Sequence, residues 1–154
     1  MNQESTTATG ELLTPRELAR PVRHFSTRFP ATRRGAHAAR HLAERELAAW
    51  EGVPEEIAES AVLVVAELAA NAALHGRVSG RGARPTLALA TDGVLRVEVT
   101  DARGERAPAP PPVQGGESGR GLLLVAALAD RWGWTPYPPS GKSVWAEFDL
   151  RRAR

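Results

Sequence analysis

Hydrophobic and polar positions along the chain recur with two different periods, and these periods predict its strands and helices. Phe25 and Phe29 share one face of an alternating segment, as in a half-buried strand. Ala39, Ala43 and Leu47 recur instead at helical spacing. The elements predicted in this way are, in order, strand 23–29, helices 35–50 and 54–75, strands 86–90 and 94–100, helix 121–131, and strands 132–135 and 141–150.

Turn residues separate these elements and fix their order. Asp92-Gly93 is a strong hairpin signal between two predicted strands, Pro54 suits the first position of a helix, and Gly76 suits a helix end. The order strand, two helices, two strands, helix, two strands predicts an α/β (α+β) two-layer sandwich. Its sheet is expected to be mixed, mostly antiparallel, and covered by helices on one face.

The chain of 154 residues has the length of one domain. Residues 1–20 are polar and predict a flexible N-terminal tail, residues 21–150 form the expected domain, and residues 151–154 form a short basic tail. Residues 102–119 predict a long loop rich in proline and glycine. A loop of that length within one domain is typically functional or disordered.

Composition excludes several classes of function. The chain has no cysteine, which excludes disulfides and cysteine-bound zinc and fits a reducing cytoplasm. No apolar run reaches the roughly 20 residues that span a bilayer, and the N-terminus lacks the apolar core of a signal peptide. The net charge is only +2 and the arginines are dispersed among acidic residues, so we expect no direct contact with nucleic acid or membrane.

The helix predicted at residues 54–75 carries the most informative polar pair in the chain. Between residues 60 and 74, Glu67 is the only charged residue and Asn71 the only side-chain amide. They lie one turn apart on the same side of the helix. A carboxylate on an apolar helix costs free energy unless it is paired. The pair therefore predicts a site for a ligand or a metal ion.

Three further features accompany this pair. Asp101 follows the strand 94–100 in phase with its buried positions, which suits an acceptor for a polar ligand, although a turn-forming or helix-capping aspartate is the alternative. Gly119-Arg120-Gly121 precedes an apolar helix, and glycines before a helix N-terminus are weak evidence for a phosphate site. Ser143 is a small polar residue at the start of the last strand.

Taken together, these motifs resemble a known family. The motifs are Glu67-x-x-x-Asn71-x-x-x-His75-Gly76, Val97-Glu98-Val99-Thr100-Asp101, Glu117-Ser118-Gly119-Arg120-Gly121-Leu122 and Gly141-Lys142-Ser143-Val144-Trp145. In this order and spacing they resemble the Bergerat-fold (GHKL) ATP-binding superfamily of histidine kinases and gyrase. Within it, the chain is most similar to the bacterial anti-sigma-factor serine/threonine kinases.

This resemblance implies ATP and Mg²⁺ as cofactors. It implies that Asn71 is the Mg²⁺ ligand and Glu67 the general base. It also implies that Asp101 accepts a hydrogen bond from the adenine amine and that Ser143 supports this contact. Gly119 and Gly121 let the lid and the helix N-terminus reach the phosphates. The other implied nucleotide-binding positions are Gly104, Ser118, Arg120 and Leu122.

The function implied by the resemblance is a cytoplasmic kinase that phosphorylates an anti-sigma antagonist protein and sequesters a sigma factor, with a homodimer through the first strand. The run Asp101-Ala102-Arg103-Gly104 holds one of the two glycines of the superfamily pattern. This keeps open a nucleotide-sensing interaction module with little or no kinase activity. A histidine-kinase fragment is less favoured, because only about 22 residues precede the first predicted strand, too few for its helix pair.

Overall fold

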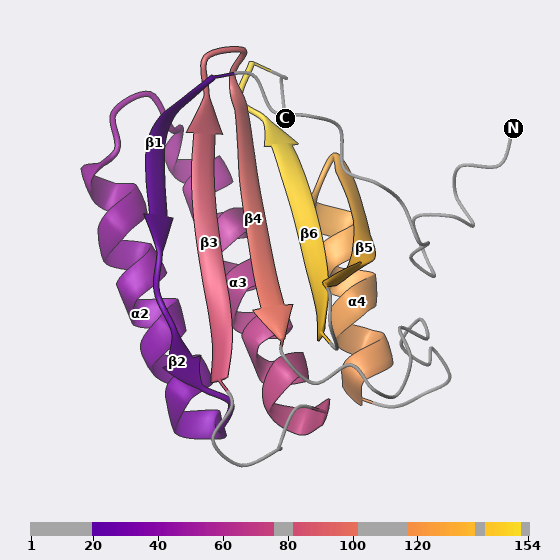
Figure 1. Cartoon of the computed structure of the whole chain (residues 1–154). Coiled ribbons are helices and arrows are strands. Elements are labelled where there is room, and N and C mark those ends of the chain that lie inside the picture. Colours follow the sequence, from indigo (N-terminus) through magenta and orange to yellow (C-terminus); the bar gives the residue numbers. More distant parts are fainter. Residues whose placement is uncertain (1–19, 76–81, 102–116, 138–140, 152–154) are drawn as a thin grey trace, which may run out of the picture.

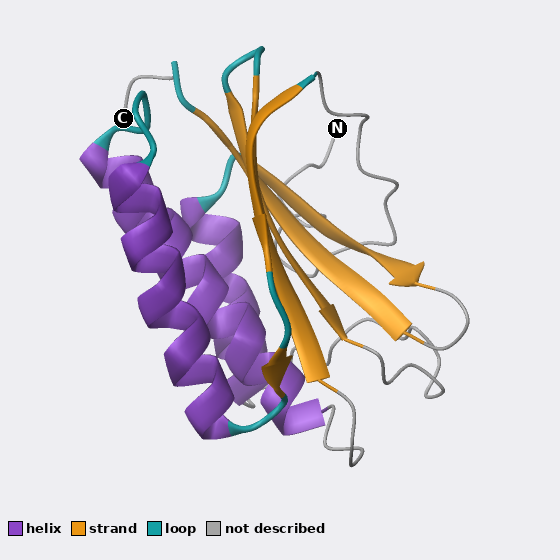
Figure 2. Ribbon diagram, turned by 60° about the vertical axis from the view of Figure 1, so that its left-hand side comes forward, coloured by secondary structure: helices purple, strands orange, loops and turns teal. Residues whose placement is uncertain are grey.

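The computed structural model describes residues 20–75, 82–101, 117–137 and 141–151, without the side chains of 74, 75, 117–121 and 137. These residues form a sheet and a layer of helices, and all three helices lie on the same face of the sheet (Figures 1 and 2). The elements are β1 (Pro21–Ser26), β2 (Phe29–Pro30), α2 (Arg33–Ala49), α3 (Glu55–His75), β3 (Gly82–Ala90), β4 (Val94–Asp101), α4 (Glu117–Leu128), β5 (Arg131–Tyr137) and β6 (Gly141–Asp149). The predicted two-layer sandwich is confirmed.

The sheet has six strands in the order β1-β3-β4-β6-β5, and β2 also pairs with β3. Every pairing between the described strands is antiparallel, so the expected mixed character is not found in this part of the chain. The hairpin between β3 and β4 turns where the sequence predicts it, with Gly93 at φ +84°. That value lies in the left-handed region, which glycine adopts without steric cost. No described helix is long and apolar enough to cross a membrane.

The strand predicted at residues 23–29 is divided into β1 and β2, and β3 begins at Gly82 rather than at residue 86. Pro85 lies inside β3, although proline lacks the N–H that a central strand uses for pairing. The carbonyl of Pro85 accepts a hydrogen bond from the N–H of Thr27 (3.3 Å), in the break between β1 and β2. The N and C=O of a strand residue face the same neighbour. The missing N–H of Pro85 therefore faces the interrupted part of that neighbour.

Helix α4 is displaced by several residues from the prediction of 121–131. It begins at Glu117 and ends at Leu128. Beyond it, the N–H of Asp130 donates to the carbonyl of Glu147 (2.9 Å), and the N–H of Asp149 donates to Oδ2 of Asp130 (2.7 Å). The N–H of Ala129 still donates to the carbonyl of Val125 (2.9 Å), so the chain turns from the helix to β6 at Asp130 and continues into β5.

Helix α2 is held close to the sheet by its first turn. The hydroxyl of Thr32 accepts a hydrogen bond from the N–H of Gly35 (2.9 Å) and so forms an N-terminal cap, which was not among the predicted features. A Cβ on Gly35 would collide with the carbonyl oxygen of Pro30. Glycine at this position therefore permits the close approach of α2 to β2.

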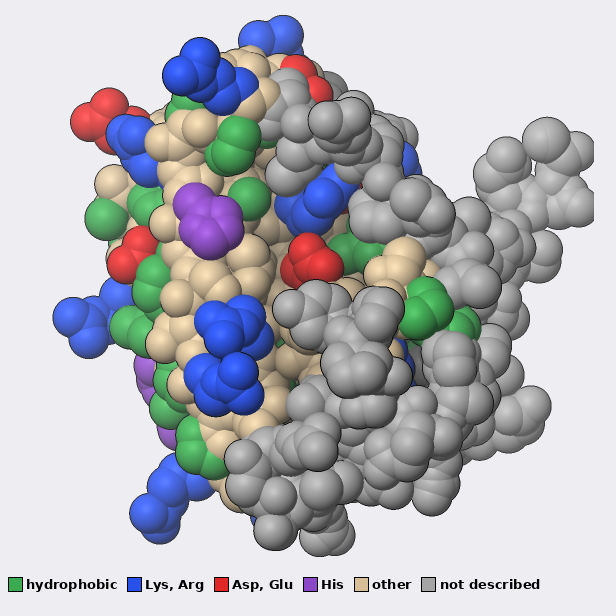
Figure 3. Space-filling view, viewed as in Figure 1, with side chains coloured by type: hydrophobic (Ala, Val, Ile, Leu, Met, Phe, Trp, Pro, Cys, Tyr) green, Lys and Arg blue, Asp and Glu red, His purple; other side chains and the backbone are tan. Residues whose placement is uncertain are grey.

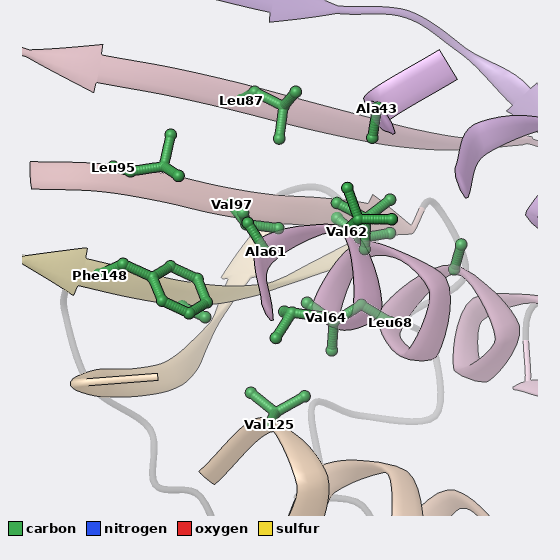
Figure 4. Close-up of a cluster of buried hydrophobic side chains, with 14 of the residues drawn as sticks. Ala43, Ala61, Val62, Val64, Leu68, Leu87, Leu95, Val97, Val125 and Phe148 are labelled. Atoms are coloured by element: carbon green, nitrogen blue, oxygen red, sulfur yellow. The ribbon is translucent and has the colours of Figure 1, made fainter. Parts of the chain in front are cut away.

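The hydrophobic core fills the space between the helices and the sheet. Alternate residues of β3, β4 and β6 face α3 and α4 (Figure 4). The labelled core side chains include Leu87, Leu95, Val97 and Phe148 from the sheet, Val64 and Leu68 from α3, and Val125 from α4. This packing sets the position of α3 over β4, which matters for the candidate site.

The opposite face of the sheet carries charged side chains (Figure 3). Glu147 is 0 % exposed, and its Oε2 accepts hydrogen bonds from Nε and Nη2 of Arg96 (3.0 and 2.6 Å). Its Oε1 accepts from Nε of Arg131 (2.9 Å), and Arg131 also contacts Asp149 (2.6 and 3.0 Å). The hydrogen bonds to Asp149 are the main cause of a raised pKa of Arg131. The guanidinium of Arg96 also lies 6.0 Å from the ring centroid of Trp145.

Candidate nucleotide-binding site

A cavity lies between α3, α4 and the sheet, on the side that faces the helices. Its lining residues come from four elements: Leu68, Asn71 and Ala72 of α3, Val99 and Asp101 of β4, Leu122 of α4, and Lys142 and Val144 of β6. Its volume is about 20 Å³, which is room for about one water molecule. An adenine ring is much larger than this volume.

Asp101 provides the buried carboxylate of this cavity. It is the last residue of β4, and it is 4 % exposed. Its side chain lies on the same face as Val99, as the alternation of the strand predicted. Apolar side chains form most of the surrounding wall. A carboxylate in such a wall is well suited to accept a hydrogen bond from an amine of a bound ligand.

Asn71 and Glu67 lie half-buried on α3, one turn apart, as predicted. Asn71 lines the cavity, whereas Glu67 is not one of its lining residues. Within the described residues, no group of three or more His, Cys, Asp or Glu side chains could hold a metal ion. Mg²⁺ usually takes only one or two protein ligands and completes its shell with water and phosphate oxygens. The amide oxygen of Asn71 fits that pattern as a single protein ligand.

Lys142 and Ser143 are neighbours on β6 and lie on opposite faces of the sheet. Lys142 pairs with Asp101 across the strands and lines the cavity. Ser143 is one residue further along β6, and its Oγ lies 2.6 Å from Oγ1 of Thr100 on the opposite face of the sheet. A step of one residue reverses the face in a strand. The structure therefore brings Lys142, and not Ser143, to Asp101, and the role of Ser143 at the adenine stays a prediction.

The glycine motif lies at the start of α4 and not in front of it. Because α4 begins at Glu117, Ser118, Gly119 and Arg120 belong to its first turn, where backbone N–H groups lack helical partners. The side chains of Ser118 and Arg120 lie outside the described part of the structure, as does Gly104 with the predicted loop. Leu122 is 1 % exposed and lines the cavity, and its role in binding a nucleotide stays a prediction.

Lys142 gives a direct chemical test of where a nucleotide binds, because it is the only lysine of the chain. An amine-acylating reagent can therefore modify only Lys142 and the N-terminal amine. We expect saturating Mg-ATP to slow the acylation of Lys142 several-fold, since a bound nucleotide covers the side chain. Peptide mass spectrometry measures both rates, and the N-terminal amine is the internal control. If ATP binds and the rate at Lys142 does not change, the nucleotide lies elsewhere.

The sheet, the single helical layer and the cavity that holds Asn71 and Asp101 together define a two-layer ATPase fold of the Bergerat class. The chain belongs to the family described as the histidine kinase-like ATPase domain, whose family model matches residues 29–148. Membership of an ATPase domain family implies that the chain binds a nucleotide.

A comparison with solved structures confirms the fold. A chain of the SiaB–SiaC complex from Pseudomonas aeruginosa is similar to this one with a TM-score of 0.60 and 18% sequence identity. The match covers 95% of this chain and 94% of that chain. At this identity the likeness establishes a shared fold. A comparison with curated proteins gives no match.

Proposed function

We propose that the chain is a Mg²⁺- and ATP-dependent serine/threonine protein kinase of the anti-sigma-factor type. It phosphorylates an antagonist protein and sequesters a sigma factor in the cytoplasm. The observation that supports this proposal most is the meeting of Asn71, Asp101 and Leu122 from three different elements in one cavity. The similarity to a chain from a two-protein complex supports a protein partner. A homodimer through β1 is part of the same proposal.

The proposed reaction gives a role to Asp101, Asn71 and Glu67. Asp101 accepts a hydrogen bond from the adenine amine and so orients the adenine ring. Asn71 would hold Mg²⁺, which neutralises phosphate charge when it is bound. The hydroxyl oxygen of the antagonist's Ser or Thr forms a bond to the γ-phosphorus. The bond between this phosphorus and the bridging oxygen breaks, ADP leaves, and the hydroxyl proton passes to the carboxylate of Glu67.

Binding of ATP is the first test of this function. We expect Asp101→Asn to weaken ATP binding by roughly 10- to 150-fold, because a hydrogen bond to a charged group contributes about 1.5–3 kcal/mol. Isothermal titration calorimetry in the presence of Mg²⁺ measures the change. Thr100→Ala is the matched control, since Thr100 is adjacent in the chain but lies on the other face of the sheet. Equal loss in both variants would contradict the assigned role of Asp101.

The second candidate function is a nucleotide-sensing module that changes its affinity for a partner when ATP binds. It is favoured by the run Asp101-Ala102-Arg103-Gly104, which has one of the two glycines of the superfamily pattern. Both functions require ATP binding. They differ in the transfer of labelled phosphate from ATP to a candidate antagonist: transfer supports the kinase, and binding without transfer supports the module.

A further inference from the structure

A second and larger hollow lies between α2 and α3, near the turn that joins them. Its volume is about 580 Å³, and it shares no lining residue with the nucleotide cavity among the described residues. Its lining residues are Arg40, Glu44, Leu47, Ala48, Trp50, Val53, Glu55, Ala58, Glu59, Val62 and Leu63. We refer to it as the α2–α3 groove.

The floor of the α2–α3 groove is apolar and part of it is open to solvent. Leu47 and Val62 are buried at its base, whereas Leu63 is 38% exposed. Val22, Leu63 and Leu123 are the large hydrophobic side chains that are exposed in the described part of the chain. Of these, Leu63 lines the groove. An exposed leucine beside a concave apolar surface is typical of a site that a partner covers.

The charge around the α2–α3 groove is unbalanced. Three lining residues are glutamates, Glu44, Glu55 and Glu59, and one is a cation, Arg40. Glu55 stands in the first turn of α3, where a carboxylate also stabilises the helix dipole. Glu59 lies beyond that turn, so the dipole does not account for it. The groove therefore presents an apolar floor between acidic edges.

We infer that the α2–α3 groove binds a basic amphipathic helix of a partner protein. The apolar stripe of such a helix packs on Val62 and Leu63, and Lys or Arg residues beside the stripe lie next to Glu44 and Glu59. The sign of the charge excludes an anionic membrane surface as the occupant, because the acidic edges repel it. The inference rests on the proposed function, which requires a protein partner. It adds the chemical character of the partner segment that binds.

A designed peptide tests the groove. The probe is a fluorescein-labelled helix of about 18 residues with leucines at helical spacing and lysines beside them, and a matched peptide has glutamates in place of the lysines. We expect the basic peptide to bind more tightly than the acidic one in fluorescence anisotropy. Leu63→Asp should weaken binding of the basic peptide at least about tenfold, as expected for a leucine that the peptide covers. Leu123→Asp, which alters a leucine that is 49% exposed on α4, should leave it within about twofold.

A charge reversal gives an independent readout. Glu59→Arg should weaken the basic peptide and strengthen the acidic one, because the groove edge changes sign. Equal binding of the two peptides, or binding that Leu63→Asp does not change, would overturn the inference. Calorimetry with Mg-ATP on the same Leu63→Asp protein separates the two proposals. If ATP binds normally and the peptide test fails, the groove proposal is wrong and the nucleotide function stands. If the unmodified chain does not bind ATP, the nucleotide function is wrong.

Discussion

Glu67→Gln is expected to slow phosphate transfer by about 10² to 10⁴ while ATP remains bound. Glutamine has nearly the shape of glutamate, so the packing of α3 is kept, but its amide cannot take the proton of the attacking hydroxyl. Loss of a general base typically lowers the rate by about 10² to 10⁴. Glu67 lies half-buried one turn before Asn71 and outside the residues that line the cavity, so ATP affinity should change little. Transfer of labelled phosphate to a candidate antagonist, and calorimetry with Mg-ATP, measure the two effects.

The matched control for this variant is Glu56→Gln. Glu56 is on the same helix and is exposed near its beginning, so this variant should transfer phosphate at the rate of the unmodified chain. Transfer that persists in Glu67→Gln would remove Glu67 from the role of base. A variant that loses both transfer and ATP binding would show that Glu67 maintains the shape of the site.

Glu147→Ala is expected to produce a large loss of stability. The carboxylate is fully buried and bonds Arg96 through Oε2 and Arg131 through Oε1. Removing one partner of a buried ion pair typically costs about 3–5 kcal/mol. Arg131 keeps its hydrogen bonds to Asp149, so the cost arises mainly at Arg96. Urea denaturation followed by circular dichroism measures the free energy of unfolding. A loss below about 1 kcal/mol would show that water replaces the carboxylate at little cost.

Glu98→Ala is the control for Glu147→Ala, because Glu98 is a half-buried carboxylate on the same face of the sheet. We expect it to cost less than about 1 kcal/mol.

The pKa of Arg131 is raised in the folded state, so the contribution of Arg131 to stability is complete below its pKa in the unfolded chain and is lost only at strongly alkaline pH. The cost of Glu147→Ala that depends on Arg131 should therefore be equal at pH 6 and pH 9.

Much of the fold follows from periodicity and turn chemistry. Helix α3 could be predicted almost residue by residue, since Pro54 marks its beginning, Gly76 marks its end, and no proline or glycine interrupts the residues between them. The hairpin at Gly93 followed from the requirement for a positive φ. The early start of β3 could not be predicted, because Pro85 is tolerated only through the break between β1 and β2. Such a gap in a neighbouring strand leaves no signal in the local sequence.

The candidate site could be predicted only where a residue's position follows from the period of its own helix or strand. Asp101 and Asn71 are fixed by the periods of their own strand and helix, and both line the cavity. Lys142 was missed because its place depends on the register between β4 and β6, where one residue decides which side chain faces the helices. The sequence offered one signal for it: Lys142 is the only lysine in a chain whose other cations are arginines. The partners of Glu147 likewise depend on strands that are distant in sequence.

Helix α3 contributes residues to both candidate binding surfaces, the nucleotide cavity and the α2–α3 groove. Its 21 residues extend for about 30 Å, with Leu63 of the groove and Asn71 of the cavity roughly 12 Å apart along its axis. Any displacement of α3 that accompanies opening of the cavity is therefore also a displacement of one wall of the groove. Thermodynamic linkage makes the consequence reciprocal: by whatever factor a nucleotide changes the affinity for a partner helix, that helix changes the affinity for the nucleotide by the same factor.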